Sequence, residues 1–160
     1  MQKLNFLNTR DRKELFHQLK EQFDFRSELD FLFFEASDSK LFLLSRDYAN
    51  LDLSKLRINN QGLYLGKRER DGIRLSIEGS QLIGAKKNLL PLTKSQAEVW
   101  MKGEDIPVNG NLGYVIVKHD KDILGCGMLK HDLLRNMVPK ERRLKSVTES
   151  DENFLQDSFG

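Results

Sequence analysis

The amino-acid sequence predicts an α+β fold in two parts. Three observations support this prediction: apolar residues recur at helical spacing near the N-terminus, short apolar runs are joined by turn sequences, and a capped helix opens the second half. With 160 residues, the chain is long enough to form one domain or two small ones. Its 39% hydrophobic and 31% charged residues are typical of a globular protein and argue against bulk disorder.

The first half begins with a predicted helix and continues in strands. Asn8 and Thr9 are both suitable N-cap residues, and the apolar positions after them have helical spacing: Leu15, Phe16, Leu19 and Phe23. Residues 29–34 and 41–44 are apolar runs separated by a turn sequence, which predicts a hairpin of buried strands. A further strand begins at residues 63–65, and a type I′ turn sequence at Asp71 and Gly72 leads into a returning strand at 73–77.

The second half differs in its composition and its order of elements. Residues 84–88 are small, polar and basic, which marks a domain boundary. Thr93 and Gln96 fit a capping box, so a short helix is expected there, with Trp100 on its apolar face as a core residue. Strand-like runs at 113–117 and 123–129 predict a hairpin, and residues 138–144 predict an edge strand.

These boundaries predict three parts of the chain. We expect an N-terminal α+β domain over residues 1–85 and a second domain over residues 86–147. Residues 148–160 contain four acidic and no basic residues, and we expect them to form a largely disordered tail.

One order of elements in the second half is informative: a helix ending in Lys102 and Gly103, a strand at 113–117, and a strand containing Gly125 and Gly127. This order resembles a PUA domain, a module named after pseudouridine synthases and archaeosine transglycosylases, although Tyr114 stands where an aspartate is common. Residues 138–143 resemble the C-terminal RNA-binding region of Sun-type RNA cytosine methyltransferases. The first half is similar in layout to the pre-PUA domain of small two-domain ribosome-assembly proteins. The resemblance implies a pre-PUA domain followed by a PUA pseudo-β-barrel that grips structured RNA.

The distribution of charge also favours a polyanionic partner. The formal net charge is only +2, but residues 84–145 carry 12 basic and 7 acidic side chains, whereas residues 1–83 carry 14 and 13. A basic segment next to an acidic tail is typical of chains that bind nucleic acid, although a solvated charged surface would have the same composition.

Lys and Arg can contact the phosphates and 2′-hydroxyls that an A-form RNA helix exposes. The candidate RNA-binding residues are Lys86, Lys87, Lys94, Lys102, Lys130, Arg135, Lys140, Arg142 and Arg143. Successive strand residues point to opposite faces, so at most one of Arg142 and Arg143 faces a given surface, which leaves a structural role open for the other. Aromatic residues are scarce in this half before the tail, which favours recognition of RNA shape over the reading of single-stranded bases.

The sequence offers little support for chemistry. Cys126 lies between two glycines in an apolar strand, where a small buried side chain is the expected role. His17, His119 and His131 lack the close spacing of metal ligands. We therefore expect no catalytic residue, no metal and no cofactor.

The predicted function is that of an RNA-binding accessory protein. It would recognise structured RNA, either rRNA or a tRNA-like RNA, during ribosome biogenesis or RNA modification. The alternative is an adaptor that docks on a separately encoded RNA-modification or ribosome-assembly protein through Phe33 and Phe34 or through the acidic tail, although a buried strand also explains the two phenylalanines. A small-molecule enzyme is a third possibility. No apolar run is long enough to span a bilayer, so we expect no membrane partner and a cytoplasmic protein.

Overall fold

The computed structural model describes residues 4–27, 29–45 and 62–144. Its contacts divide the chain into two compact units, residues 1–87 and residues 88–160, which are described separately below. Each unit has a five-stranded sheet with helical elements beside it, so the predicted α+β fold is confirmed. The predicted acidic tail lies outside the described residues.

The N-terminal unit contains an antiparallel sheet whose strands are neighbours in chain order. The strands are β1 (Leu4–Phe6), β2 (Phe31–Ala36), β3 (Lys40–Ser45), β4 (Leu63–Glu69) and β5 (Gly72–Leu75). Its two described helices are α1 (Thr9–Phe23) and α3 (Ile77–Ile83). The two hairpins expected from the turn sequences are therefore present, as β2–β3 and β4–β5.

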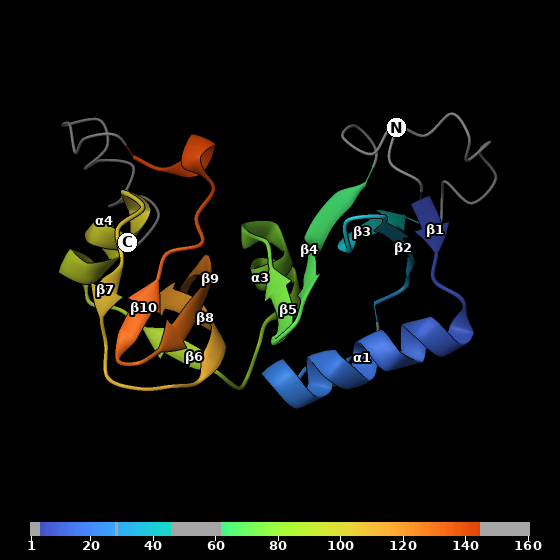
Figure 1. The fold of residues 1–160 in the computed structure, drawn as a ribbon, viewed down its shortest axis with the longest axis horizontal. Coiled ribbons are helices and arrows are strands. Elements are labelled where there is room, and N and C mark those ends of the chain that lie inside the picture. Colours follow the sequence, from blue (N-terminus) through green and yellow to red (C-terminus); the bar gives the residue numbers. More distant parts are fainter. Residues whose placement is uncertain (1–3, 28, 46–61, 145–160) are drawn as a thin grey trace. The chain divides into compact units, whose positions relative to one another are not determined.

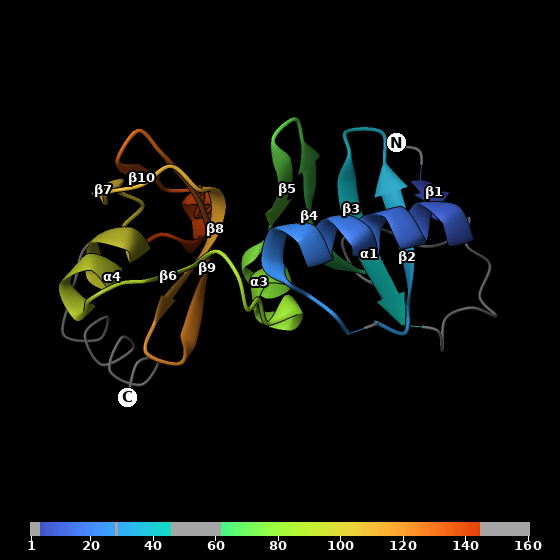
Figure 2. The same ribbon diagram turned by 90° about the horizontal axis from the view of Figure 1, so that it is seen from below.

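Helix α1 lies across one face of this sheet (Figures 1 and 2). It begins after Asn8, whose side chain accepts a hydrogen bond from the backbone N–H of Asp11, so the predicted N-cap is confirmed. The apolar stripe of the helix is buried against the sheet through Leu15, Leu19 and Phe23. The stripe that the sequence predicts is thus the contact between the helix and the sheet.

The opposite face of the sheet carries a row of aromatic side chains, one from each of four adjacent strands. The rings of Phe6, Phe34, Phe42 and Tyr64 follow one another with centroids 5.6, 5.5 and 5.4 Å apart. Phe33 points the other way and meets Phe16 of α1 edge-on at 5.5 Å. Phe33 and Phe34 are each only 3% exposed, so both belong to a buried strand and neither is available as a docking side chain.

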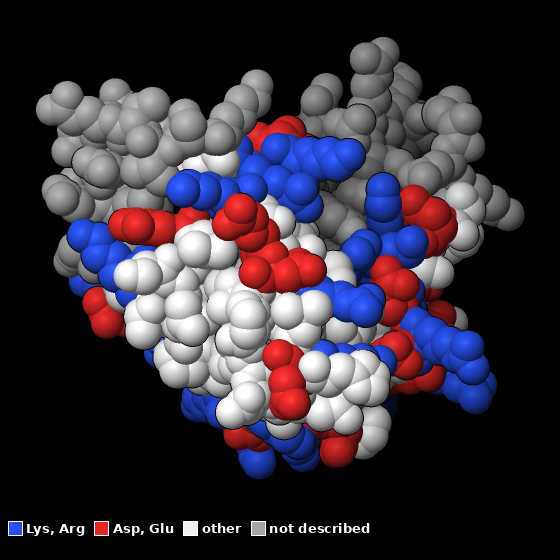
Figure 3. All heavy atoms as spheres, turned by 60° about the vertical axis from the view of Figure 1, so that its left-hand side comes forward, with Lys and Arg blue, Asp and Glu red and all other residues white. Residues whose placement is uncertain are grey.

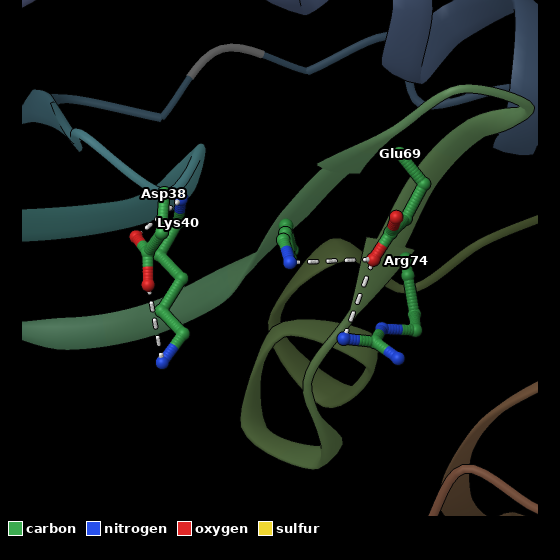
Figure 4. Close-up of polar contacts among 5 residues, drawn as sticks. Asp38, Lys40, Glu69 and Arg74 are labelled. Carbon is green, nitrogen blue, oxygen red and sulfur yellow. Dashed lines mark hydrogen bonds and ion pairs between the residues drawn. The ribbon is translucent and has the colours of Figure 1, made fainter.

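Ion pairs lie at the two hairpins of this sheet, β2–β3 and β4–β5 (Figure 4). Glu69 Oε1 lies 3.4 Å from the Arg74 guanidinium across the β4–β5 hairpin, and Asp38 Oδ2 lies 3.4 Å from Lys40 Nζ at the β2–β3 turn. Burial raises the pKa of the Tyr64 phenol above its ordinary value, and the neighbouring positive charge of Arg74 opposes that rise.

Helix α3 was not predicted. The strand expected over residues 73–77 ends at Leu75 because Ser76 is the N-cap of α3 and its hydroxyl accepts from the N–H of Gly79 at 2.8 Å. The same hydroxyl donates to the carbonyl of Tyr64 at 2.5 Å, which joins the helix start to β4. A Cβ at Gly79 would collide with the Leu65 carbonyl, so glycine permits this close packing.

The C-terminal unit contains a mixed sheet in the order β6-β8-β9-β10-β7, whose strands curl as in a pseudo-barrel. Strand β6 runs parallel to β8, and the other neighbours are antiparallel. The elements are β6 (Leu89–Pro91), α4 (Lys94–Met101), β7 (Ile106–Pro107), β8 (Gly113–His119), β9 (Asp122–Lys130), β10 (Leu133–Arg135) and the short 3₁₀ helix η3 (Lys140–Arg142).

The core of the C-terminal unit is built around Trp100. This side chain is fully buried, as predicted, and it lies against the backbone of β9 at Gly127, where an added Cβ would be only 2.7 Å from its ring. Gly125 has a φ of 139° and faces β8 where the register shifts after Val117. The glycine pair therefore serves curvature and close packing, as expected for a barrel strand.

The edge strand predicted for residues 138–144 is wrong. Residues 140–142 form η3 instead, because Pro139 starts a tight turn in which its carbonyl accepts from the N–H of Arg142 at 2.9 Å. The sheet edge beside β10 is already occupied by β7. No helix within the described ranges is long and apolar enough to cross a membrane.

Candidate nucleic-acid interface

Helix α4 presents a predicted basic residue at each end. It starts at a complete capping box: Thr93 accepts from the Gln96 N–H at 3.2 Å, and the Gln96 side chain accepts from the Thr93 N–H at 3.0 Å. Lys94 in its first turn and Lys102 at its C-cap are both exposed. The cap fixes the direction of the helix and hence the positions of both lysines.

The chain segment after β10 is tied to the C-terminal end of α4. Asn136 Nδ2 donates to the carbonyl of Trp100 at 2.7 Å, while its Oδ1 accepts from the N–H of Val138 at 2.8 Å. Further on, the N–H of Leu144 donates to the carbonyl of Met101 at 2.8 Å. The segment that carries η3 is therefore attached to the helix end that carries Lys102. The sequence did not reveal Asn136, because the carbonyl of Trp100 that it binds lies 36 residues earlier in the chain.

The two successive arginines have different environments. Arg143 is half-buried: its side chain lies directly against Gly103, leaving no room for a Cβ there, and its Nε donates to the carbonyl of Val138 at 2.9 Å. Arg142 and Lys140 are exposed on η3. The two arginines therefore face different surroundings: Arg143 packs against the end of α4, and Arg142 is exposed at the surface.

The hairpin of β9 and β10 holds two more of the predicted residues. Lys130 faces Leu133, and Arg135 faces Met128, in an antiparallel register. Residues opposite one another point to the same side of a sheet, as do residues two apart on a strand, so Lys130 and Arg135 share one face. Arg135 is exposed and Lys130 is half-buried.

Lys86 and Lys87 lie elsewhere, at the C-terminal end of α1 in the N-terminal unit. Both backbone N–H groups donate to the carbonyl of Phe23, at 2.9 and 3.3 Å. The ammonium of Lys87 donates to the carbonyl of Glu21 at 3.0 Å. Both lysines therefore satisfy the carbonyl pole of α1, and they belong to the N-terminal unit, whereas α4 and η3 belong to the C-terminal unit.

Figure 3, which turns the C-terminal unit toward the viewer, shows Lys and Arg side chains in separate groups with neutral and acidic surface between them.

Two of the residues considered for chemistry, Cys126 and His119, have structural positions. Cys126 is 4% exposed in β9, as expected for a small buried side chain. His119 Nδ1 lies 2.9 Å from the Leu92 carbonyl, where it links β8 to the residue after β6. Within residues 4–27, 29–45 and 62–144, no group of three or more His, Cys, Asp or Glu side chains is arranged to hold a metal ion.

A curled mixed sheet, a short capped helix at its side and a glycine-bent central strand define the class of the C-terminal unit as a PUA-type pseudo-barrel. Residues 87–144 match the family model for the methyltransferase RsmF PUA domain. The chain thus contains a PUA domain that resembles the C-terminal region of Sun-type RNA methyltransferases, as the sequence motifs indicated.

Two similar curated proteins are both named ribosomal RNA small subunit methyltransferase F. The chain is 28% identical over 92 residues to ribosomal RNA small subunit methyltransferase F of Vibrio vulnificus (strain YJ016), a match that covers 56% of this chain and 20% of that protein. It is also 28% identical over 137 residues to ribosomal RNA small subunit methyltransferase F of Shewanella woodyi (strain ATCC 51908 / MS32), covering 84% of this chain and 28% of that protein. Both matches are longer than the C-terminal unit, which spans residues 88–160, so the similarity extends into the N-terminal unit. The chain spans less than a third of the length of either relative.

Proposed function

We propose that this chain binds structured ribosomal RNA of the small subunit and thereby serves RNA modification as an accessory, non-catalytic protein. It would do so with a PUA domain at residues 86–147 supported by an N-terminal domain at residues 1–85. The observation that carries the proposal is the PUA match over residues 87–144. In this unit Lys102, Lys140 and Arg142 are exposed around the junction between the end of α4 and the segment that carries η3. The choice of RNA follows from the names of the relatives.

The geometry of the junction supports contact with an A-form helix. Hydrogen bonds from Asn136 and Leu144 hold η3 against the α4 end, so the cations have a fixed base. Phosphates and 2′-hydroxyls are the groups that such an RNA offers to side chains, and fixed cations lose less conformational freedom on binding them.

The test measures binding of the full chain to fluorescently labelled hairpins from small-subunit rRNA. The charge-reversed variant Lys140→Glu/Arg142→Glu should bind about tenfold more weakly or worse, since a hydrogen bond to a charged group contributes ~1.5 kcal/mol or more. The logarithm of affinity should fall linearly with that of salt concentration in the wild type. The slope should be shallower in the variant, by about one for each phosphate that its side chains no longer neutralise.

The matched control is Lys118→Glu/Lys121→Glu, which changes the charge equally at β8 and the following turn. It should keep most of the affinity. Equal binding by wild type and the Lys140/Arg142 variant would remove η3 from the interface. Wild-type binding that is independent of salt would contradict the phosphate mechanism altogether.

A further inference from the structure

A pocket in the N-terminal unit lies along one side of α1. It has a volume of about 300 Å³ and is lined by Lys13, Phe16, His17, Lys20, Phe25, Arg26 and Ser27. The four lining residues of α1 stand at positions 13, 16, 17 and 20, a spacing that places them on one stripe of the helix. Residues 25–27, which follow the C-cap residue of α1, close the other side.

Two aromatic rings give the pocket a rigid apolar wall. Phe16 and Phe25 stack with their centroids 6.2 Å apart. Phe16 also meets Phe33 of β2 edge-on, and the guanidinium of Arg12 lies over it at 5.4 Å. That guanidinium is held by the carbonyls of Leu29 and Phe31, at 2.6 and 2.9 Å. The wall is therefore fixed before any ligand arrives.

The polar side of the pocket is basic. Lys13 and Lys20 are exposed, and no acidic side chain lines the pocket, although α1 carries Asp11, Glu14 and Glu21 at other positions. Arg26 is paired through Nε with Asp24 at 2.8 Å, so its charge is partly offset. Each side of the pocket thus combines a basic side chain with an aromatic ring, which favours an anionic ligand with a flat apolar part.

We propose that this pocket binds one nucleotide of single-stranded RNA, with the phosphate at Lys13 and Lys20 and the base against Phe16 and Phe25. The volume lies at the low end of small-molecule sites, which suits a single nucleotide. Only an unpaired base can leave its helix to enter a pocket. The proposal rests on the proposed function, because the strand would be an extension of the structured RNA that the PUA domain binds.

The experiment compares two labelled RNAs: a small-subunit rRNA hairpin and the same hairpin with a five-nucleotide single-stranded extension. The extension should raise the affinity of the wild-type chain by about tenfold, which corresponds to ~1.4 kcal/mol. The variant Lys13→Gln/Lys20→Gln should lose that gain and still bind the plain hairpin normally. Lys13→Arg/Lys20→Arg keeps the charge and should retain the gain.

The matched control is Arg10→Gln/Arg70→Gln, which removes two exposed charges of the same unit outside the pocket. It should behave as wild type. If the Lys13→Gln/Lys20→Gln variant still gains affinity from the extension, the pocket is not the nucleotide site, and the proposed PUA interface is unaffected. An extension of abasic residues that binds as well as the normal one would overturn the base contact and reduce the site to a phosphate site.

A direct readout separates failure of this proposal from failure of the proposed function. Addition of a free single-stranded pentanucleotide should shift the amide signals of Phe16, His17 and Phe25 in nitrogen-labelled full-length protein, whether or not the hairpin binds. Shifts confined to the C-terminal unit, or equal shifts with an acidic peptide, would contradict a nucleotide site at α1.

Discussion

At the scale of single residues, Gly127 is a tightly constrained position of the C-terminal unit. An added Cβ would lie 2.7 Å from Trp100 Cη2 and 2.8 Å from Leu134 Cδ1, inside a close-packed core. Gly127→Ala should lower the free energy of unfolding by about 1–3 kcal/mol, as overpacking does. Urea denaturation followed by fluorescence measures this change.

The cause of that destabilisation can be isolated with a second substitution. Trp100→Phe removes the ring atom that the new methyl group would meet, so the effect of Gly127→Ala should be smaller in a Trp100→Phe background. Strictly additive effects of the two substitutions would mean that the steric contact is not the cause.

Tyr64 makes the stability of the N-terminal unit depend on alkaline pH. Burial raises the pKa of its phenol in the folded state, whereas the unfolded chain ionises near pH 10. Above that pH the unfolded state binds fewer protons than the folded state, so stability falls as the pH rises; below it, the phenol contributes no pH dependence. The urea midpoint of wild type should therefore drop relative to Tyr64→Phe between about pH 9 and 11. The ionisation of Tyr64 itself can be followed as the difference between the phenolate absorbance of the wild type and that of Tyr64→Phe. A midpoint of this difference at or below pH 10 would contradict the prediction.

Residues of the candidate site differ in how far their positions could be predicted. The alternation rule allowed only one of Arg142 and Arg143 at a given surface, and the structure packs Arg143 against Gly103. The rule assumed a strand, however, and the reason for the outcome is a long-range contact. The same holds for Lys87, whose ammonium binds a carbonyl of α1 that is 66 residues earlier in the chain. Composition identifies cations but not the backbone groups that hold them.

At the scale of elements, those with a local signal were predictable. Helix α1, the capped helix α4 and the three hairpins each have a cap or turn sequence that acts within a few residues. The strands β6, β7 and β10 have two or three residues each, too few for a periodic pattern. They depend on their partners in the sheet: β6 pairs with β8, β10 with β9, and β7 with β10. Helix α3 was missed because its cap, Ser76, ends an alternating run that reads as strand.

At the scale of the whole molecule, the two units differ in the RNA features that we assign to them. Each has its own sheet and its own buried side chains, with Trp100 central to one and Phe23 to the other. The aromatic wall at α1 belongs to the N-terminal unit, and the η3 junction belongs to the C-terminal unit. Hairpin binding and the gain from a single-stranded extension should therefore be separable.

The fragment of residues 86–147 tests this separation. With about 60 residues it is small for an independent domain, but its core includes a fully buried tryptophan and a five-stranded sheet, so we expect one cooperative unfolding transition. The fragment should bind the plain rRNA hairpin within about threefold of the full chain, a difference well below the 1.4 kcal/mol that corresponds to tenfold. It should show no gain from the single-stranded extension. Calorimetry establishes folding first, because only a folded fragment reports on binding. A folded fragment that still gains affinity from the extension would place the single-strand contact in the PUA domain, and one that fails to bind the hairpin would make the N-terminal unit part of the duplex interface.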